Sequence, residues 1–315
     1  MRVFVAGATG AVGRHLVPQL IADGHQVTAT TRTKSKFAAL SELGAEPVLV
    51  DGLDAAAVGE AVAHAEPEAI IHQMTALAGL SDLKHFDRTF AGTNQLRTAG
   101  TDNLLAAARA AGVRRFIAQS FTGWPNVSAA GTAITEDDPF DPEPPKQQRE
   151  SLAAIEHVER AVLGAPLEGV VLRFGMFYGP GASEDMVELI RKRRMPIVGN
   201  GDGIWSMTHV ADAAGASVAA LTRGAGVYNI VDDDPAPTRE IFTTLAEISG
   251  AKKPMRVPVW LARLAAGEVG VSLMTRPYGT SNAKAKRELG WAPRWASWRD
   301  GFRYGLTDAT RAAAR

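Results

Sequence analysis

The chain has 315 residues, of which 46% are hydrophobic and 22% are charged, proportions typical of a globular protein that buries a large core. Lysine plus arginine number 34, as do aspartate plus glutamate, so the formal net charge is zero, which argues against a protein that binds nucleic acid regardless of sequence. The absence of cysteine excludes disulfides, thiolate metal sites and cysteine nucleophiles.

The chain begins with a short apolar run, residues 1–6, that leads directly into a glycine-rich turn. This run is shorter than the apolar part of a signal peptide. The sequence also has no uninterrupted stretch of about 18 apolar residues, the length that crosses a bilayer. We therefore expect a cytoplasmic protein with no membrane partner.

Short apolar runs alternate with helical patterns over the first 175 residues, as in the βαβ units of a parallel sheet. The expected strands are Val3–Ala6, Gln26–Thr31, Pro47–Val50, Ala69–His72, Phe116–Gln119 and Val170–Phe174. The expected helices are Ala11–Asp23, Lys34–Leu43, Ala55–Ala63, a long helix ending near Ala111, and Ser151–Leu163. The acidic, proline-rich segment Glu136–Pro145 predicts a loop.

Glycine and proline interrupt the alternation after Arg173. Shorter elements follow, with helices at Ala211–Leu221 and Thr238–Ser249 and a strand at Tyr228–Val231. We expect residues 1–175 to form one domain. Residues 176–315 would then be mostly a smaller C-terminal lobe that binds the substrate and is partly interleaved with the first domain.

The segment Gly-Ala-Thr-Gly-Ala-Val-Gly, residues 7–13, follows the first strand and opens the first helix. In a dinucleotide-binding turn the first glycine permits the tight turn, the second lets the backbone approach a pyrophosphate, and the third packs helix against strand. The context predicts an α/β fold with a Rossmann-type doubly wound parallel sheet. The residues expected to hold the dinucleotide here are Gly7, Thr9, Gly10, Ala11, Val12 and Gly13. A glycine turn without a ligand is the alternative.

The end of the second strand indicates which dinucleotide is bound. An acidic residue there favours NAD, whereas an arginine accommodates the 2′-phosphate of NADP. Arg32 stands at this position with Lys36 nearby, and the first acidic residue beyond is Glu42. NADP is therefore the predicted cofactor and NAD the alternative, although a basic helix start in water would show the same residues.

Several further segments resemble the extended short-chain dehydrogenase/reductases, the NAD(P)-dependent epimerase/dehydratase group. The matching segments are residues 50–54, 71–74, 100–105, 115–120, 172–181, 208–212 and 286–293. The resemblance implies adenine contacts at Asp51, Gly52 and Leu53. It implies that Gln73, Met74 and Thr75 line the cofactor, and that Phe174, Gly175 and Met176 lie beside the nicotinamide.

The family's catalytic Tyr-x-x-x-Lys pair is missing. The resemblance places the tyrosine at Gln147 or Gln148 and the lysine at Ser151 or Leu152, and no tyrosine occurs anywhere before Tyr178. Glutamine forms hydrogen bonds but does not transfer a proton at neutral pH. The chain therefore resembles the atypical members of the family.

Three residues are candidates for the catalytic work. The resemblance implies that Ser120 orients the substrate oxygen, although a serine at a strand end also serves local backbone bonds. Tyr178 is the phenol closest in sequence to the nicotinamide segment, but such a tyrosine more often packs in the core. Lys146 adjoins the position of the missing tyrosine, and a lysine after two prolines is usually solvated.

Trp124, Gln148 and Trp205 are the candidate substrate-binding residues, since apolar walls suit a substrate with a hydrophobic body. The seven histidines show no metal-ligand spacing, so we expect no metal site. The expected partner is a small-molecule substrate of unspecified identity. The family also implies a homodimer formed through the helices ending near Ala111 and Leu163.

Together these features predict an NADP(H)-dependent oxidoreductase, or an epimerase/dehydratase-like enzyme, that acts on a carbonyl or hydroxyl carbon with a non-standard proton donor. The lost tyrosine and lysine keep two alternatives open. One is a dinucleotide-binding sensor or partner subunit without redox turnover. The other is a lyase or isomerase that keeps the cofactor as a scaffold.

Overall fold

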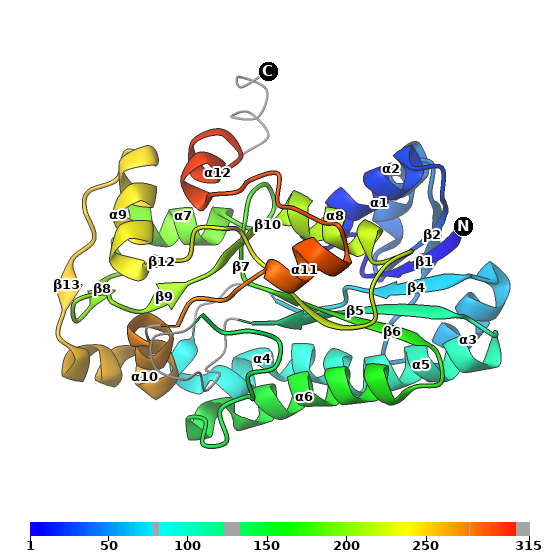
Figure 1. The fold of residues 1–315 in the computed structure, drawn as a ribbon, viewed down its shortest axis with the longest axis horizontal. Helices are drawn as coiled ribbons and strands as arrows, with labels where there is room; N and C mark the ends of the chain where they lie inside the picture. The colour runs from blue at the N-terminus through cyan, green and yellow to red at the C-terminus, as the bar shows by residue number, and fades with distance from the viewer. Residues whose placement is uncertain (78–81, 123–132, 277, 307–315) are drawn as a thin grey trace.

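A parallel sheet forms the centre of the molecule (Figure 1). The structure, a computed structural model, describes residues 1–77, 82–122, 133–276 and 278–306. In this part of the chain seven strands follow the order β3-β2-β1-β4-β5-β6-β11, and neighbouring strands are all parallel. The strands are β1 (Arg2–Ala6), β2 (Gln26–Thr31), β3 (Glu46–Leu49), β4 (Ala69–His72), β5 (Arg115–Phe121), β6 (Glu168–Phe174) and β11 (Gly226–Ile230). This is the Rossmann order, and the predicted fold class is confirmed.

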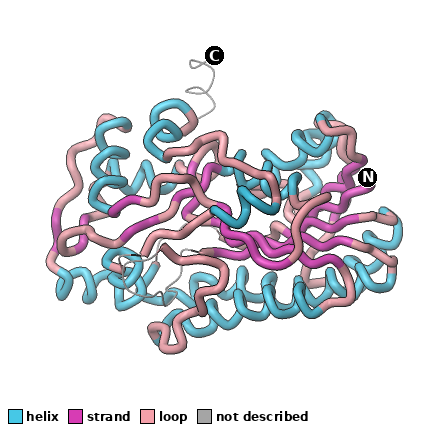
Figure 2. The backbone as a smooth tube through the Cα atoms, viewed as in Figure 1, coloured by secondary structure: helices cyan, strands magenta, loops and turns pink. Residues whose placement is uncertain are grey.

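Helices cover both faces of the sheet, as the cyan tubes on either side of the magenta strands show (Figure 2). One face carries α1 (Gly13–Ala22), α2 (Phe37–Glu42) and α8 (Val210–Ala219); the other carries α3 (Ala55–Ala65), α5 (Thr101–Ala110) and α6 (Arg149–Gly164). Along β1, Val3 and Val5 pack into the first core, whereas Phe4 and Ala6 pack into the second. The apolar run from Val3 to Ala6 is continuous because both faces of β1 are buried.

Most predicted elements are present with ends shifted by at most two residues. The expected helix Lys34–Leu43 begins with a 3₁₀ turn, η1 (Lys34–Lys36), before α2. The long helix expected to end near Ala111 is a composite, because α4 (Phe86–Gln95) joins α5 through a π-helical turn, η3 (Leu96–Gly100). Single π turns inside α-helices often lie at functional sites.

The second half contains elements that the sequence pattern did not predict. The unpredicted helices are α7 (Glu184–Arg191), α10 (Val259–Thr275), α11 (Ala283–Glu288) and α12 (Trp298–Tyr304). The predicted helix Thr238–Ser249 is present as α9 (Thr238–Ile248). The strand pairs are β7 (Met176–Tyr178) with β10 (Met207–His209), β9 (Ile204–Trp205) with β12 (Ala236–Pro237), and β8 (Ile197–Val198) with β13 (Arg256–Val257). Strands of two or three residues are too short to show an alternating pattern. The backbone of α10 breaks its helical geometry at Gly267, where φ is +70°.

Two remaining 3₁₀ turns are η2 (Leu83–His85) and η4 (Lys146–Gln148). The segment Glu136–Pro145 holds neither helix nor strand, as its composition predicts. None of the helices in the described ranges is both long and apolar enough to cross a bilayer.

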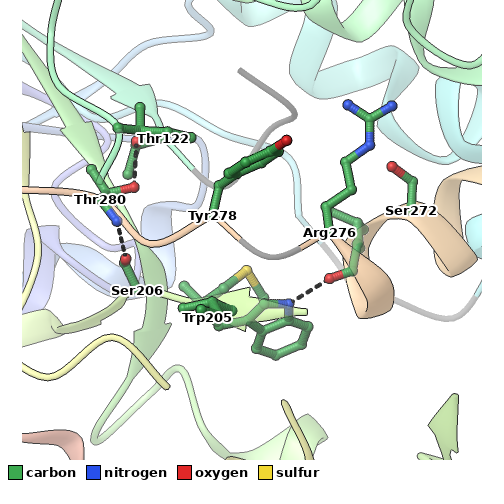
Figure 3. Close-up of a pocket in the computed structure, with 11 residues that line it drawn as sticks. Thr122, Trp205, Ser206, Ser272, Arg276, Tyr278 and Thr280 are labelled. Carbon is green, nitrogen blue, oxygen red and sulfur yellow. Dashed lines mark hydrogen bonds between the residues drawn. The ribbon is translucent and has the colours of Figure 1, made fainter. Parts of the chain in front are cut away.

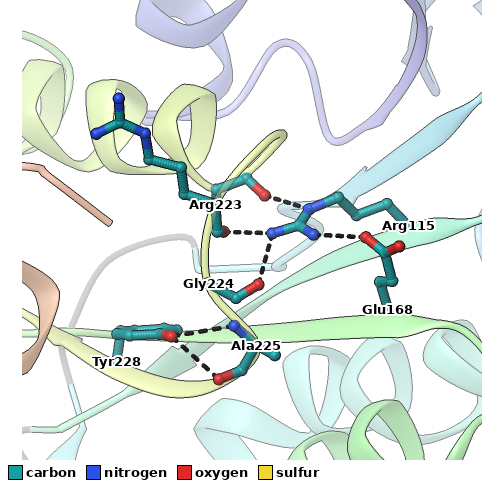
Figure 4. A network of polar contacts seen from close by, with 7 residues as sticks. Arg115, Glu168, Arg223, Gly224, Ala225 and Tyr228 are labelled. Carbon is teal, nitrogen blue, oxygen red and sulfur yellow. Dashed lines mark hydrogen bonds and ion pairs between the residues drawn. The ribbon is translucent and has the colours of Figure 1, made fainter. Parts of the chain in front are cut away.

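The second half of the chain returns to the sheet, where β11 pairs with β6 and α8 packs against α1. A buried arginine on β5, Arg115, holds this return in place (Figure 4). Its guanidinium donates to the Glu168 carboxylate at 2.7 Å, to the Gly224 carbonyl at 2.8 Å and to the Arg223 carbonyl. The Arg115 guanidinium thus joins β5 and β6 to the loop before β11. The sheet is therefore built from both halves of the chain.

A buried carboxyl group follows β11. Asp232 is 3% exposed, and one of its oxygens accepts from the Asp234 backbone N–H at 3.2 Å. The other oxygen, Oδ2, has no hydrogen-bond partner among the described residues. Burial, with the nearby carboxyl groups of Asp234 and Asp233, raises the pKa of Asp232 to about 8. The folded protein therefore holds a proton that an unfolded chain would release.

We expect Asp232→Asn to stabilise the protein by an amount that grows with pH. The folded carboxyl group keeps its proton up to about pH 8, whereas an aspartate with the ordinary pKa of 3.8 has already lost it. The free energy of unfolding of the unsubstituted protein therefore falls between these pH values and levels off above them. Urea denaturation of both proteins from about pH 5 to about pH 9 measures the difference. Parallel stability curves over that range would contradict the raised pKa.

Candidate functional site

The glycine turn between β1 and α1 is built around close backbone contacts. Gly7 has φ +93°, and a Cβ there would lie 2.7 Å from the carbonyl carbon and oxygen of Gln73. A Cβ at Gly13 would lie 2.4 Å from the Gly7 oxygen. At Gly10 the closest atom would be the Gly7 oxygen at 3.4 Å. Gly7 and Gly13 are therefore required by packing, whereas Gly10 leaves free space beside the turn.

A cavity opens next to this turn at the carboxyl ends of the central strands. Its lining residues are Gly7, Thr9, Gly10, Thr30, Thr31, Arg32, Val50, Gly52, Gln73, Met74, Thr75 and Leu96. The free space at Gly10 and the buried Gln73 Oε1, which has no partner among the described residues, fit a dinucleotide whose phosphates approach the turn. When bound there, the nicotinamide of such a cofactor supplies or accepts a hydride.

Eight of the predicted cofactor-binding residues line this cavity: Gly7, Thr9, Gly10, Arg32, Gly52, Gln73, Met74 and Thr75. The other predicted residues do not line it. Ala11, Val12 and Gly13 lead from the turn into α1, and the side chains of Lys36, Asp51 and Leu53 are exposed. Phe174 is buried in β6, and Gly175 lies between β6 and β7. Met176 lines a different cavity. For this second group, cofactor contact stays a prediction.

Sequence reasoning missed four lining residues: Thr30, Thr31, Val50 and Leu96. The rule that ligands bind beyond the carboxyl ends of parallel strands could have found the first three, which end β2 or follow β3. No sequence signal pointed to Leu96, because its place depends on the π turn.

The side chain of His72 fixes the backbone of the segment after β4, which lines the cavity. The Met74 N–H donates to His72 Nδ1 at 3.2 Å, so Nε2 carries the proton and donates to Thr101 Oγ1 at 3.1 Å. Burial, more than the nearby charge of Arg97, lowers the pKa of His72 to about 4. The ring is therefore neutral at physiological pH and fixes the segment after β4.

A second cavity lies between the end of β5 and segments from the second half of the chain (Figure 3). Its lining residues are Thr122, Ile134, Met176, Ile204, Trp205, Ser206, Ser272, Leu273, Arg276, Tyr278 and Thr280. The Trp205 indole donates to the Leu273 carbonyl at 2.8 Å, which fixes that ring in the wall. Arg276 donates to Asp141 at 2.8 Å and is 38% exposed. The cavity thus combines aromatic walls, hydroxyl groups and one guanidinium.

The predicted substrate-binding residues lie in different places. Trp205 lines the second cavity, and Trp124 lies outside the described residues. Gln148 is 1% exposed at the end of η4, and neither its amide oxygen nor its amide nitrogen has a hydrogen-bond partner among the described residues. Gln147 is exposed. Gln148 is thus the buried one of the two candidates for the tyrosine position, and both candidates for the lysine position, Ser151 and Leu152, are buried. The assignment of these positions stays a prediction.

The three candidate catalytic residues are also separated. The Ser120 hydroxyl donates to Glu159 at 2.7 Å, and Glu159 forms a bidentate pair with Arg173 at 2.8 and 2.7 Å. Tyr178 is fully buried, and its ring packs edge-on against Phe302.

Burial raises the pKa of the Tyr178 phenol above its ordinary value, with further contributions from nearby carboxylates. Lys146 is exposed at the start of η4. None of the three lines either cavity, so their catalytic roles stay predictions. Thr122, which sequence reasoning did not select, does line the second cavity, and its hydroxyl lies 3.2 Å from that of Thr280.

Comparison with known proteins identifies the class. Residues 3–231 match the model of the NAD dependent epimerase/dehydratase family, and the chain belongs to this family. It is an enzyme of the extended short-chain dehydrogenase/reductase type, and its relatives are reductases and epimerases. The resemblance read from the sequence motifs is confirmed.

Two relatives illustrate the chemistry of the group. A "3-diazoavenalumate denitrifying reductase" of a Streptomyces species is 38% identical over 96% of this chain and 99% of its own. A 4-hydroxy-2-methyl-3-oxo-4-farnesyl-3,4-dihydroquinoline-1-oxide ketoreductase of Stigmatella aurantiaca is 30% identical over 93% and 92%.

Solved structures share the fold. A UDP-glucose 4-epimerase of Thermotoga maritima with UDP-glucose matches with a TM-score of 0.76 and 22% identity, covering 100% of both chains. A UDP-glucose 4-epimerase of Thermus thermophilus in complex with NAD matches with a TM-score of 0.74 and 24% identity, covering 99% and 100%.

We expect Gly10→Ala to weaken dinucleotide binding without destabilising the free protein. The added methyl group meets no protein atom closer than 3.4 Å, so it occupies space beside the turn where a phosphate would lie. Gly13→Ala is the contrasting variant, because its methyl group would overlap the Gly7 oxygen at 2.4 Å and lower the melting temperature. Thermal unfolding without ligand and calorimetric titration with NADPH measure both effects. Equal binding by Gly10→Ala and the unsubstituted protein would remove this turn from the phosphate site.

Proposed function

We propose that the protein is an NADPH-dependent reductase of an aromatic acid bearing a diazo group. The observation that carries this proposal is Gln148, a buried amide at one of the two positions to which the resemblance assigns the family's tyrosine proton donor. A site without that donor suits a substrate whose reduction takes no proton from the protein.

The preference for NADPH rests on the end of β2. Arg32 lines the cofactor cavity, is exposed, and forms no ion pair among the described residues. Lys36 lies one turn further on. An unpaired guanidinium presents the planar donors that a 2′-phosphate accepts. No carboxylate lines the cavity to bind the 2′-hydroxyl of NAD instead.

The substrate class follows from proton balance. Hydride addition to a carbonyl leaves an alkoxide, which must take a proton from a donor such as a tyrosine. An aromatic diazonium group that accepts hydride at its terminal nitrogen becomes a neutral diazene. The diazene then loses N₂: the carbon–nitrogen bond breaks, its electron pair stays on the ring carbon, and the N–H proton moves to that carbon. Neither step takes a proton from the protein, and the relative of 38% identity is a diazo-substrate reductase by name.

The second cavity suits an aromatic acid. The ring of Trp205 is fixed by its bond to Leu273, and Tyr278 adds a second aromatic side chain (Figure 3). Arg276, with one bond to Asp141 and a half-buried side chain, has donors left for a substrate carboxylate. The Thr122 and Ser206 hydroxyls offer neutral hydrogen bonds to a ring hydroxyl group.

The activity test uses the purified protein, NADPH and an aromatic diazo acid, with a panel of ketones and aldehydes in parallel. We expect loss of absorbance at the reduced nicotinamide band and release of equimolar N₂ with the diazo acid alone. Oxidation of NADPH by the carbonyl panel, with none by the diazo acid, would identify a carbonyl reductase and overturn the proposal.

The cofactor preference has its own test. Loss of one charge-assisted contact in Arg32→Ala should weaken NADPH binding by about tenfold to a hundredfold and leave NADH binding unchanged. Arg88, an exposed arginine on α4, provides the control substitution Arg88→Ala, which should change neither affinity. Calorimetric titration of each protein with each cofactor makes the comparison. Tighter binding of NADH than of NADPH by the unsubstituted protein would contradict the role given to Arg32.

A further inference from the structure

A buried arginine without a counterion lies beside the cofactor cavity. Arg97 is 6% exposed in the π turn η3, and its Nη1 is wholly buried without a hydrogen-bond partner. Within the described ranges its side chain forms no ion pair or hydrogen bond. Burial lowers the pKa of Arg97 to about 10, so the guanidinium keeps its charge at neutral pH. A buried charge without a partner destabilises a fold, which indicates that this one serves a ligand.

The surroundings of Arg97 place it beside the cofactor cavity, on the opposite side of β1 from Arg32. Its neighbour Leu96 lines the cofactor cavity. Its charge also acts on His72, the last residue of β4. In the sheet order, β4 and β5 lie on the opposite side of β1 from β2, which carries Arg32 at its end. A dinucleotide held with its 2′-phosphate at Arg32 and its pyrophosphate at the glycine turn therefore extends toward the side where Arg97 lies.

The helix packing brings Arg97 to the level of the missing catalytic pair. The α4–α5 segment runs beside α6 (Figure 1). Asn94 donates to Ser151 at 3.0 Å, and His157 lies 2.8 Å from Asp102. In the chain Arg97 lies between the residues that form these two contacts, so it packs alongside the first turns of α6. Helix α6 begins directly after Gln148, whose amide has no partner among the described residues.

We propose that Arg97 binds an oxygen of the nicotinamide-riboside half of the cofactor, and so supplies from α4–α5 the positive charge that the family's lysine would supply from α6. The ligand group is a ribose hydroxyl or the carboxamide oxygen, both acceptors for a guanidinium. The inference rests on the proposed function only in taking NADPH as the cofactor.

The test compares Arg97→Met with Arg97→Lys and with the control Arg109→Met, which changes an exposed arginine on α5. Each protein is titrated with NADPH and with adenosine 2′,5′-bisphosphate, which lacks the nicotinamide riboside. We expect Arg97→Met to weaken NADPH binding by about tenfold or more and to leave bisphosphate binding unchanged. Arg97→Lys should keep most of the NADPH affinity, and Arg109→Met should bind both ligands normally.

Thermal unfolding of the free proteins separates a ligand-binding arginine from a structural one. Removing an uncompensated buried charge should raise the melting temperature of Arg97→Met, or at least not lower it. A variant that unfolds at a lower temperature, fails to fold, or loses affinity for both ligands equally would overturn the proposal. So would unchanged NADPH binding. Because the readout is binding, failure of the diazo acid as a substrate would overturn the proposed function and leave this result standing.

Discussion

The cofactor site depends on one backbone contact, that between the turn after β1 and the segment after β4. Gly7 approaches the Gln73 backbone so closely that a single methyl group would separate the two. The neutral ring of His72 stabilises this contact by accepting a hydrogen bond from the Met74 N–H. The Thr30 hydroxyl accepts from the Gly7 N–H at 3.1 Å and adds the end of β2. These contacts join three adjacent strands, β2, β1 and β4, at the carboxyl edge of the sheet, where ligands of such folds generally bind.

Polar groups around the cleft fall into two kinds. Ser120, Glu159 and Arg173 are joined in a buried network in which the Arg173 guanidinium is paired with a carboxylate, although its Nη1 has no partner among the described residues. Arg97 and the Gln148 amide are equally buried but unpartnered, which is costly in the absence of a ligand. The absence of a counterion among the described residues is the observation on which the proposed role of Arg97 rests.

Loss of the tyrosine and lysine changes what the site can do while leaving the fold intact. Gln148 and Leu152 occupy buried positions at the start of α6 without disturbing the helix. The carboxyl edge of the sheet still presents the glycine turn, Arg32 and an aromatic-walled cavity. Hydride chemistry is a property of the cofactor, whereas the absent pair would have supplied the proton, and the proposed substrate class rests on that difference.

The sequence alone determined the parallel sheet, the glycine turn after β1 and the absence of the tyrosine and lysine, because each is a local pattern: an apolar run, a glycine spacing, a residue absent from a motif. Only the tertiary structure showed that the Ser120 hydroxyl donates to Glu159 and that Tyr178 packs in an apolar cluster formed by the second half of the chain. It also showed that Arg97 is buried without a partner. These are facts about which distant side chains meet. A local pattern fixes the element on which a residue lies, whereas its partners depend on how helices and strands far apart in the chain pack together.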